Sequence, residues 1–249
     1  MRGFIEKLTS RYFLWYEKLK SKVELVKFFL RQDLNYVLPL LAHFQTTMGG
    51  SNSFQQKKPL DSHNDPLPWY TYPAIEFLYQ FDFSKCDVFE YGSGNSSLFW
   101  GKRAKYVTSV ESDREWFDSV KNKIPENQKI IFAPDKMDYV NSIQTFNRVF
   151  DIVIVDGMWR RLCTVEAIKS VKPGGLIIFD NMDWYPDTSK FLRDNGFFQI
   201  DFIGFGPVNI IAWCTSIFLK GDCCIPRRSD VDTVQVLDGI VQLAPDDSF

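Results

Sequence analysis

A glycine turn between two short apolar segments is the feature that most constrains the fold of this chain. An apolar segment that begins at Cys86 ends at Glu90, and Gly92 and Gly94 follow directly. The residues after the turn have the pattern of a helix, and a second apolar segment then ends at Glu111. Strand, glycine turn, helix and strand in this order predict a βαβ unit that holds a nucleotide-like ligand over its strand ends. The glycines let the backbone approach the ligand because no Cβ obstructs it.

The spacing of the two acids and the residue after the turn refine this prediction. Glu111 lies 21 residues after Glu90, close to the roughly 20-residue spacing of an acid that binds ribose hydroxyls. The dinucleotide pattern requires a third glycine, which packs the helix against the strand beneath a pyrophosphate. This chain has Ser97 at that position. The departure weakens the match to a dinucleotide-dependent oxidoreductase, which stays as an alternative.

The alternation of apolar and amphipathic segments predicts an α/β fold with a mostly parallel sheet covered on both faces. We expect strands at 86–91, 106–111, 128–133, 150–155, 175–180, 197–204 and 213–219. We expect helices near 95–102, 113–122, 138–145, 160–171 and 186–195. No helical pattern separates the last two strands, so they should form an antiparallel pair at the closing edge of the sheet.

Composition argues against several classes of function. The formal net charge is −2, so the chain has no strong electrostatic footprint for nucleic acid. Its five cysteines are an odd number, and the adjacent Cys223 and Cys224 lack the spacing of a zinc site. Free cysteines in a reducing, cytoplasmic environment are the simplest account. The most apolar early segment, residues 23–44, is interrupted by charges and is not expected to cross a membrane.

The chain divides into three regions by pattern. Residues 1–66 are expected to form a helical arm and a linker, residues 67–220 the main domain, and residues 221–249 a tail without an assigned role. Apolar residues at helical spacing predict a helix in the arm, with a break at Pro39. A packing or homodimer contact is its expected role, and a membrane-surface helix is the alternative. Residues 46–66 are rich in Gly, Ser, Asn and Gln, which predicts a linker or mobile lid without regular structure.

Polar side chains follow the fourth and fifth predicted strands. Asp156 comes after the fourth strand, and Asp180, Asn181 and Asp183 come after the fifth. Since ligands bind beyond the carboxyl ends of parallel strands, these side chains should converge. The oxygens of Asp156, Asp180 and Asn181 suit Mg²⁺ or another hard divalent ion. The alternative is that the acids cap helices or hold an amine of the ligand.

The stretch from residue 68 to residue 220 resembles class I S-adenosylmethionine-dependent methyltransferases. An acid two residues before Gly92 is similar to motif I of that family, in which the ligand has no pyrophosphate. A largely uncharacterised bacterial-type group of the family carries segments found here at 68–75, 90–96, 109–111, 155–157, 180–181 and 215–218. The resemblance implies a Rossmann-like sheet, S-adenosyl-L-methionine as cofactor and methyl transfer as activity. It implies these cofactor-binding residues: Glu90, Gly92, Gly94, Glu111, Asp135 and Asp156.

The strand ends are also similar to those of the catechol-type, metal-dependent O-methyltransferases. There a divalent ion lowers the pKa of the substrate hydroxyl so that its oxygen attacks the methyl group. This resemblance implies catalytic roles for Asp156 and Asp180 and metal binding by both together with Asn181. One departure is Trp159, which stands where that family has a basic lysine.

The residues around these strand ends suggest the acceptor. Arg160 and Arg161 cannot act as general bases because arginine stays protonated, but they suit bidentate binding of an acid group on the acceptor. The segment 156–159 lacks the Pro-Pro-Tyr-type motif of N-methyltransferases, so a hydroxyl of a sugar or another small hydroxylated molecule is the expected acceptor. Further candidates are Trp69, Tyr70 and Tyr72 as cofactor-pocket walls, Trp184 and Tyr185 as stacking partners, and His63 as a base in the lid. A catalytically silent binding module is the alternative without enzyme activity.

Overall fold

The computed structural model describes residues 22–23, 34–221 and 225. The helix expected near the N-terminus, the pair Cys223 and Cys224, and nearly all of the tail lie outside the described residues. The chain forms two compact units, residues 1–46 and 47–249. In the first, α2 (Leu34–Thr46) runs through Pro39, so the predicted break there is wrong. Proline removes one backbone donor, and the hydrogen bonds on either side are enough to continue the helix.

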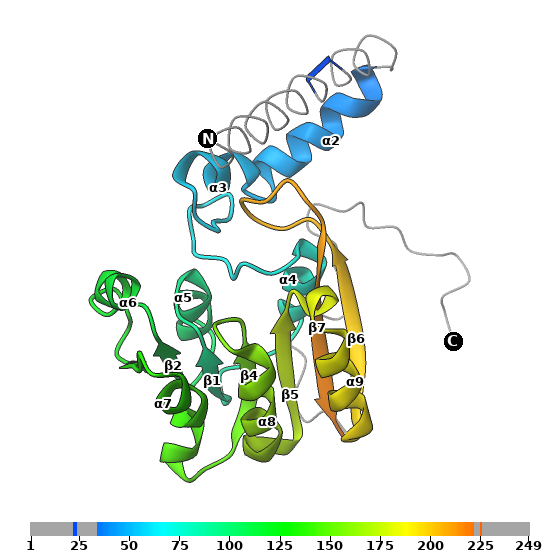
Figure 1. The fold of residues 1–249 in the computed structure, drawn as a ribbon. Coiled ribbons are helices and arrows are strands. Elements are labelled where there is room, and N and C mark those ends of the chain that lie inside the picture. The colour runs from blue at the N-terminus through cyan, green and yellow to red at the C-terminus, as the bar shows by residue number, and fades with distance from the viewer. Residues whose placement is uncertain (1–21, 24–33, 222–224, 226–249) are drawn as a thin grey trace, which may run out of the picture. The chain divides into compact units, whose positions relative to one another are not determined.

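The second unit is built on a seven-stranded sheet in its described residues, with the order β3-β2-β1-β4-β5-β7-β6. The strands are β1 (Asp87–Tyr91), β2 (Tyr106–Glu111), β3 (Gln128–Phe132), β4 (Phe150–Val155), β5 (Val171–Asp180), β6 (Phe197–Gly204) and β7 (Trp213–Lys220). All neighbours pair in parallel except β7, which is antiparallel to both β5 and β6. The predicted fold class and the antiparallel closing pair are confirmed (Figure 1).

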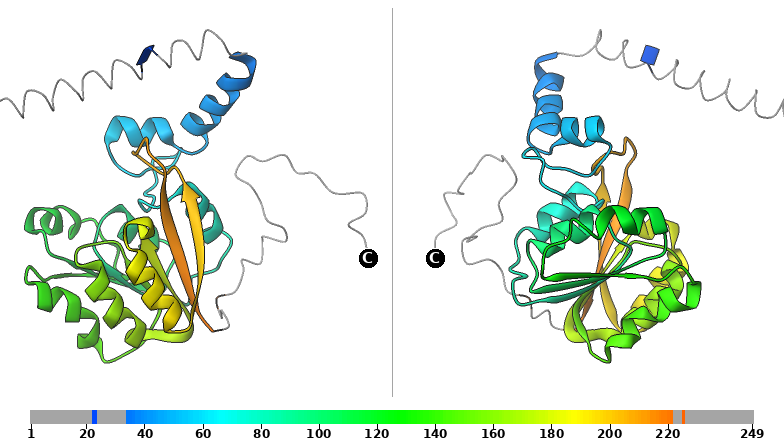
Figure 2. Two further views of the ribbon diagram at one scale, coloured as in Figure 1. Left: turned by 45° about the vertical axis from the view of Figure 1, so that its right-hand side comes forward. Right: turned by 90° about the vertical axis from the view of Figure 1, so that its left-hand side faces the viewer.

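Helices cover both faces of this sheet. They are α4 (Tyr72–Leu78), α5 (Asn95–Gly101), α6 (Arg114–Val120), α7 (Lys136–Asn141), α8 (Arg160–Ser170) and α9 (Pro186–Asp194), with 3-10 turns η1 (Ser142–Phe146) and η2 (Met182–Trp184). In Figure 1, α7, α8 and α9 lie in front of the sheet, and Figure 2 shows α4 and α5 on the opposite face. The central strand β4 is almost wholly buried, as its continuous apolar run predicts. Val171, expected at the end of a helix, instead begins β5 by pairing with Phe150.

Helix α3 (Gly50–Gln56) lies in the segment for which composition predicts no regular structure, so that prediction is wrong. Left-handed residues bound the helix, Gly49 before it and Lys57 after it. The buried Ser53 hydroxyl donates to the carbonyl of Leu60 at 2.8 Å and accepts from its N–H at 3.0 Å. The polar residues that suggested a linker therefore satisfy the backbone of a folded loop. None of the described helices is long and apolar enough to span a bilayer.

The loops after β1 and β4 touch each other, and this contact positions the strand ends. A Cβ on Gly157 would lie 2.1 Å from the Tyr139 hydroxyl and 2.9 Å from the Gly92 nitrogen. Gly92 itself has a φ of 106°, a conformation that favours glycine. The two glycines thus allow the turns after neighbouring strands to lie side by side.

We predict that Gly157→Ala lowers the free energy of unfolding by about 1–3 kcal/mol, the usual cost of overpacking a filled site. Tyr139→Phe removes the atom closest to the added Cβ. The double variant should therefore recover part of the loss. Urea unfolding of the four proteins in this mutant cycle measures both terms. Strict additivity of the two substitutions would contradict the proposed contact.

Candidate functional site

A cavity of about 900 Å³ lies at the carboxyl ends of β1, β4 and β5. Gly94 of the glycine turn lines it, together with Asp156 after β4 and Asp180 and Asn181 at the end of β5. These four predicted site residues are therefore brought together in one space. The remaining predicted cofactor residues, Glu90, Gly92, Glu111 and Asp135, are not among its lining residues.

Glu90 lies beneath the glycine turn and is held by hydrogen bonds. Its carboxylate is 1% exposed and accepts hydrogen bonds from the hydroxyls of Ser96, Ser97 and Ser109. Burial raises the pKa of Glu90, and the three hydroxyls partly oppose that shift. Ser97 also accepts from the N–H of Gly94 at 3.0 Å. The residue at the third glycine position thus ties the turn to the buried acid, and this accounts for a serine there.

Glu111 is held by four protein donors. Its Oε2 accepts from the N–H and the hydroxyl of Ser93 at 3.2 and 3.0 Å. Its Oε1 accepts from the N–H groups of Ser112 and Asp113 at 2.7 and 2.9 Å. Ser93 lines the cavity and Glu111 does not. Ser93 therefore connects the carboxylate of Glu111 to the cavity wall.

Trp116 covers the glycine turn, and the sequence reasoning missed it. Its indole nitrogen donates to the carbonyl of Ser93 at 2.5 Å, and its ring lies 3.4 Å from the position that a Cβ on Gly94 would occupy. The side chain lines the cavity and is 50% exposed. In the sequence it is a tryptophan in the first turn of the predicted helix after Glu111, which by itself does not distinguish it from a packing residue. Its flat face is suited to an aromatic base.

The Arg160 guanidinium connects the ends of β4 and β5. It donates to the carbonyl of Gly157 at 3.0 Å, to both the carbonyl and Oδ1 of Asp156 at 3.1 Å, to the carbonyl of Asp180, and to Oδ1 of Asn181 at 2.9 Å. Guanidinium has five N–H donors, and these five acceptors use them all. Arg160 therefore has no free donor for an acid group of an acceptor, which corrects the prediction made for it.

The same contacts bear on the predicted metal site. Arg160 binds side-chain oxygens of two of the three predicted ligands, Asp156 and Asn181. The third, Asp180, uses Oδ1 to accept from Trp213 at 3.0 Å and from Thr215 at 2.5 Å. A divalent ion here would face the guanidinium, which already bonds to one side-chain oxygen of each of these two residues. The described residues contain no group of three or more His, Cys, Asp or Glu side chains placed to hold a metal ion. The metal assignment stays a prediction.

Of the two acids at the strand ends, Asp180 is buried and Asp156 is partly exposed to the cavity. Burial raises the pKa of Asp180, and the charge of Asp156 adds to the shift. Burial also raises the pKa of Asp156, while the adjacent Arg160 opposes it. One of the two is therefore protonated more readily than a carboxyl in water, since two close carboxylates do not ionise independently. A carboxyl whose pKa lies near neutral pH suits proton transfer.

The other candidates separate into two groups. Trp69 and Trp184 line the cavity and are 42% and 64% exposed. Tyr70 and Tyr72 are buried, and Tyr185 packs edge-on against Phe179. These tyrosines are not among the cavity-lining residues.

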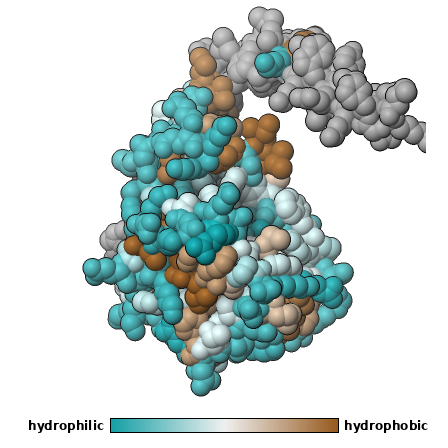
Figure 3. Space-filling model, turned by 60° about the vertical axis from the view of Figure 1, so that its left-hand side comes forward, coloured by the Kyte–Doolittle hydropathy of each residue, from teal (hydrophilic) through white to brown (hydrophobic). Residues whose placement is uncertain are grey.

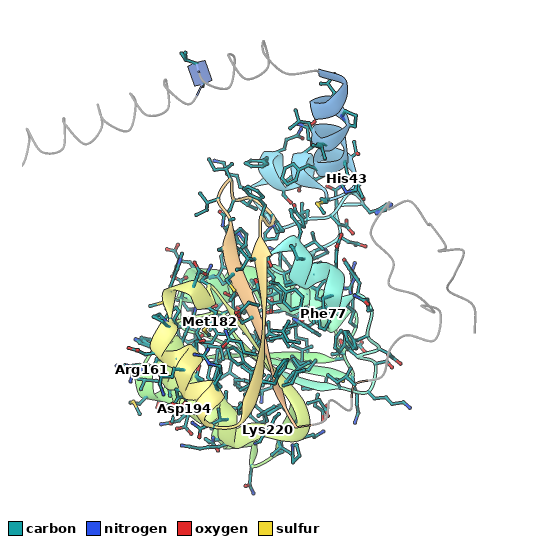
Figure 4. The ribbon with its side chains drawn as sticks, turned by 90° about the vertical axis from the view of Figure 1, so that its right-hand side faces the viewer. His43, Phe77, Arg161, Met182, Asp194 and Lys220 are labelled. Atoms are coloured by element: carbon teal, nitrogen blue, oxygen red, sulfur yellow. The ribbon has the colours of Figure 1, made fainter. Side chains whose placement is uncertain are left out.

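The remaining polar candidates also lie outside the cavity lining. Asp135 is exposed at the start of α7, and His63 is exposed beside Ser62. Asp183 accepts from the N–H of Cys214 at 3.1 Å. Arg161 is at the periphery of the domain in Figure 4.

Comparisons with known proteins identify the fold. No known family description and no curated protein sequence matches the chain. A putative caffeoyl-CoA O-methyltransferase from Staphylococcus aureus is 16% identical with a TM-score of 0.53, over 76% of this chain and 100% of that one. A methyltransferase-like protein from Silicibacter pomeroyi is 21% identical with a TM-score of 0.44, over 64% and 93%. A putative methyltransferase from Streptococcus mutans, in complex with SAH, is 14% identical with a TM-score of 0.42, over 58% and 94%. The chain has the Rossmann-like fold of class I methyltransferases.

We predict that Asp180→Asn flattens the pH dependence of stability. Because the pKa of Asp180 is raised on folding, its stabilising contribution is complete below the unfolded pKa of about 4 and is lost as pH rises through the folded pKa. As the pH rises from about 4 through the folded pKa, the free energy of unfolding of the wild type should fall more steeply than that of the variant. The two slopes should differ by at most about 1.4 kcal/mol per pH unit. Urea unfolding at several pH values measures the slopes. Equal slopes, with near-UV circular dichroism showing intact folds, would contradict the shift.

Proposed function

We propose that the chain is an S-adenosylmethionine-dependent methyltransferase that methylates a hydroxyl oxygen of a sugar or another small hydroxylated acceptor. The main observation in support of this proposal is that one cavity brings the glycine turn together with Asp156 and Asp180. Small-molecule sites have volumes of roughly 300–1,000 Å³, and about 900 Å³ suits a cofactor with a small acceptor beside it. The Staphylococcus aureus neighbour is described as a putative O-methyltransferase, which is consistent with this chemistry on the same fold.

The residues around the glycine turn fit the cofactor. Gly94 leaves the space beneath Trp116 that a Cβ would fill, and Glu90 holds the turn from below. Ser93 and Glu111 offer a hydroxyl and a carboxylate to the ribose. We retain Asp135 as the predicted adenine contact. When bound, the cofactor supplies a methyl group activated by a sulfonium.

Asp156 is the residue best placed to remove the hydroxyl proton. It lines the cavity, and its pKa is raised by burial to about 7, so its ionised form is available near neutral pH. Arg160 holds the carboxylate in place through Oδ1 at 3.1 Å. In this scheme the acceptor proton moves to Asp156. The bound cofactor would supply the methyl group, its carbon–sulfur bond breaking as the acceptor oxygen takes the carbon, which leaves S-adenosylhomocysteine. Asp180 lines the same cavity, and Trp213 and Thr215 hold its carboxyl in place.

The cavity wall supports a sugar-like acceptor. Indole rings of Trp69, Trp184 and Trp213 line it together with the amide side chains of Asn64 and Asn209. Aromatic faces pack against the C–H faces of a sugar ring, and amides both donate to and accept from hydroxyls. Acceptors of this kind need no acid group. This agrees with the contacts of Arg160, whose donors all bond within the protein and leave none for an acid group.

The other functional assignments stay predictions. A catalytically silent module has no need of a carboxyl whose pKa is raised toward neutrality inside a cavity. A dinucleotide oxidoreductase requires glycine where Ser97 bonds to Glu90. We retain a cytoplasmic location, a homodimer contact through residues 1–66 and the absence of a nucleic-acid partner as predictions from the sequence.

We expect S-adenosylhomocysteine to bind the wild-type protein in isothermal titration calorimetry, with Glu111→Ala weakening the affinity at least about tenfold. Each hydrogen bond from a ribose hydroxyl to a carboxylate contributes about 1.5–3 kcal/mol. Glu115→Ala is the matched control, because this carboxylate is exposed on α6 outside the cavity lining. Its affinity should match that of the wild type. Failure of the wild type to bind, or preferential binding of NAD, would reject the cofactor assignment.

We expect radiolabelled methyl transfer to a panel of sugars, with Asp156→Asn lowering kcat by about 10²–10⁴-fold, the usual contribution of a positioned base. Asp138→Asn, an exposed change on α7, should leave the rate unchanged. We expect full activity in EDTA, because Arg160 already bonds to the side-chain oxygens of Asp156 and Asn181 that a metal ion would need. Loss in EDTA with recovery on adding Mg²⁺ would instead establish the metal site inferred from the sequence. No labelling of any hydroxylated acceptor would count against the proposed reaction.

A further inference from the structure

The loop between β6 and β7 is an uncharged, exposed apolar segment beside the cavity. Residues 203–212 contain no charged side chain. The exposed fractions of the large apolar side chains are 72% for Ile203, 55% for Phe205, 78% for Ile210 and 61% for Ile211. Asn209 of the same loop lines the cavity. Contiguous exposed apolar surface on a folded domain marks an interaction site.

The backbone of this loop is anchored in a strained conformation. Val208 has a φ of 70°, a region that β-branched residues rarely adopt. The N–H of Tyr72 donates to the carbonyl of Phe205 at 2.8 Å, and a Cβ on Gly206 would lie 2.3 Å from the carbonyl oxygen of Tyr70. Packing against the domain therefore holds the loop in place, with its isoleucines in solvent. Strain of this kind persists where the surrounding structure maintains it and is found at binding sites.

Two cations lie on the same rim of the cavity. Lys57 and Lys58 follow α3, are exposed, and line the cavity together with Asn209. Neither has an ion pair with any residue in the described part of the chain. Helix α3 and the β6–β7 loop are side by side in every view of Figures 1 and 2. Figure 3 shows brown apolar surface at this end of the domain. We call Lys57, Lys58, Phe205, Ile210 and Ile211 the rim.

We propose that the rim docks on an anionic lipid bilayer, with Ile210 and Ile211 among the headgroups and the two lysines beside lipid phosphates. A bilayer is favoured over a protein partner because the apolar residues form a narrow loop flanked by Lys57 and Lys58, which have no ion pair among the described residues. Peripheral proteins bind interfaces by inserting a few apolar side chains and by electrostatic attraction to anionic lipids. The carboxyls of Asp156 and Asp180 lie inside the cavity and do not oppose this contact.

Docking in this way brings the mouth of the cavity to the lipid surface. The consequence for chemistry is an acceptor hydroxyl carried by a lipid, such as a glycolipid headgroup. This statement about the acceptor rests on the proposed function, whereas the docking does not. Vesicle binding without cofactor therefore tests the docking separately from methyl transfer.

The test is co-sedimentation of the full chain with vesicles of phosphatidylcholine alone and of equimolar phosphatidylcholine and phosphatidylglycerol. The wild type should partition at least about tenfold more strongly onto the anionic vesicles, and added salt should weaken that binding. Ile210→Ser with Ile211→Ser should reduce the partition coefficient at least about tenfold. Lys57→Glu with Lys58→Glu should reduce it by about fivefold or more per lysine.

Matched controls lie elsewhere on the domain. Phe198→Ser removes a side chain that is 68% exposed near the opposite end of β6, and Lys105→Glu reverses an exposed charge just before β2. Both should bind vesicles like the wild type. Unchanged binding of the isoleucine variant would overturn the proposal, as would equal binding of the wild type to both vesicles or to neither. Self-association in sedimentation velocity that the isoleucine variant abolishes would instead identify the rim as a contact between copies of the chain.

Discussion

The hydrogen bonds of the half-buried Arg160 guanidinium are the interaction on which the arrangement of the site depends. Arg160 lies at the first turn of α8, after Trp159 reverses the chain direction with a φ of 50°. From there it spans the ends of β4 and β5, which no other described side chain does with as many hydrogen bonds. Both strands carry an acid at this end, and burial of two like charges is unfavourable without a cation between them. The arginine compensates the acids and fixes the backbone that presents them.

This arrangement gives the site an internal cation at the strand ends where the sequence predicted a metal ion. An ion can be removed or exchanged, whereas a guanidinium is part of the chain and always charged. Its planar fork also imposes directions on its five acceptors. The polarity of the site is therefore set during folding. Asp156 retains access to the cavity while its charge is balanced from the side of the protein.

The sequence predicted the sheet well because the information for it is local. Each buried parallel strand is a short apolar run, so the strands from Asp87 to Lys220 were located to within a few residues, except for the early start of β5. The convergence of Asp156 with Asp180 followed from topology alone. The prediction of a linker without regular structure failed because a polar side chain there bonds to backbone groups several residues away. Ser53 bonds to Leu60 across a loop that composition describes as a linker.

The roles of single side chains in the site were harder to predict, since they depend on contacts distant in sequence. Nothing in the spacing shows that Arg160 bonds to residue 181, or that Thr215 bonds to Asp180 from another strand. The glycine motif pointed to Glu111 but not to Ser93, which shields it. Trp116 was missed because aromatic residues in amphipathic helices usually serve packing, and only its position above Gly94 distinguishes it.

The segment that follows α3 has a consequence for how ligands exchange. Residues 57–66 form part of the cavity wall and rest on α5 through the bond from Asn95 to the carbonyl of Pro59 and the exposed ion pair of Lys102 with Asp65. An exposed ion pair contributes about 0–1 kcal/mol, and one neutral hydrogen bond about as much again. Besides the packing of the buried Leu60, few polar contacts therefore hold this wall to α5, and access to the cavity along this side depends on them.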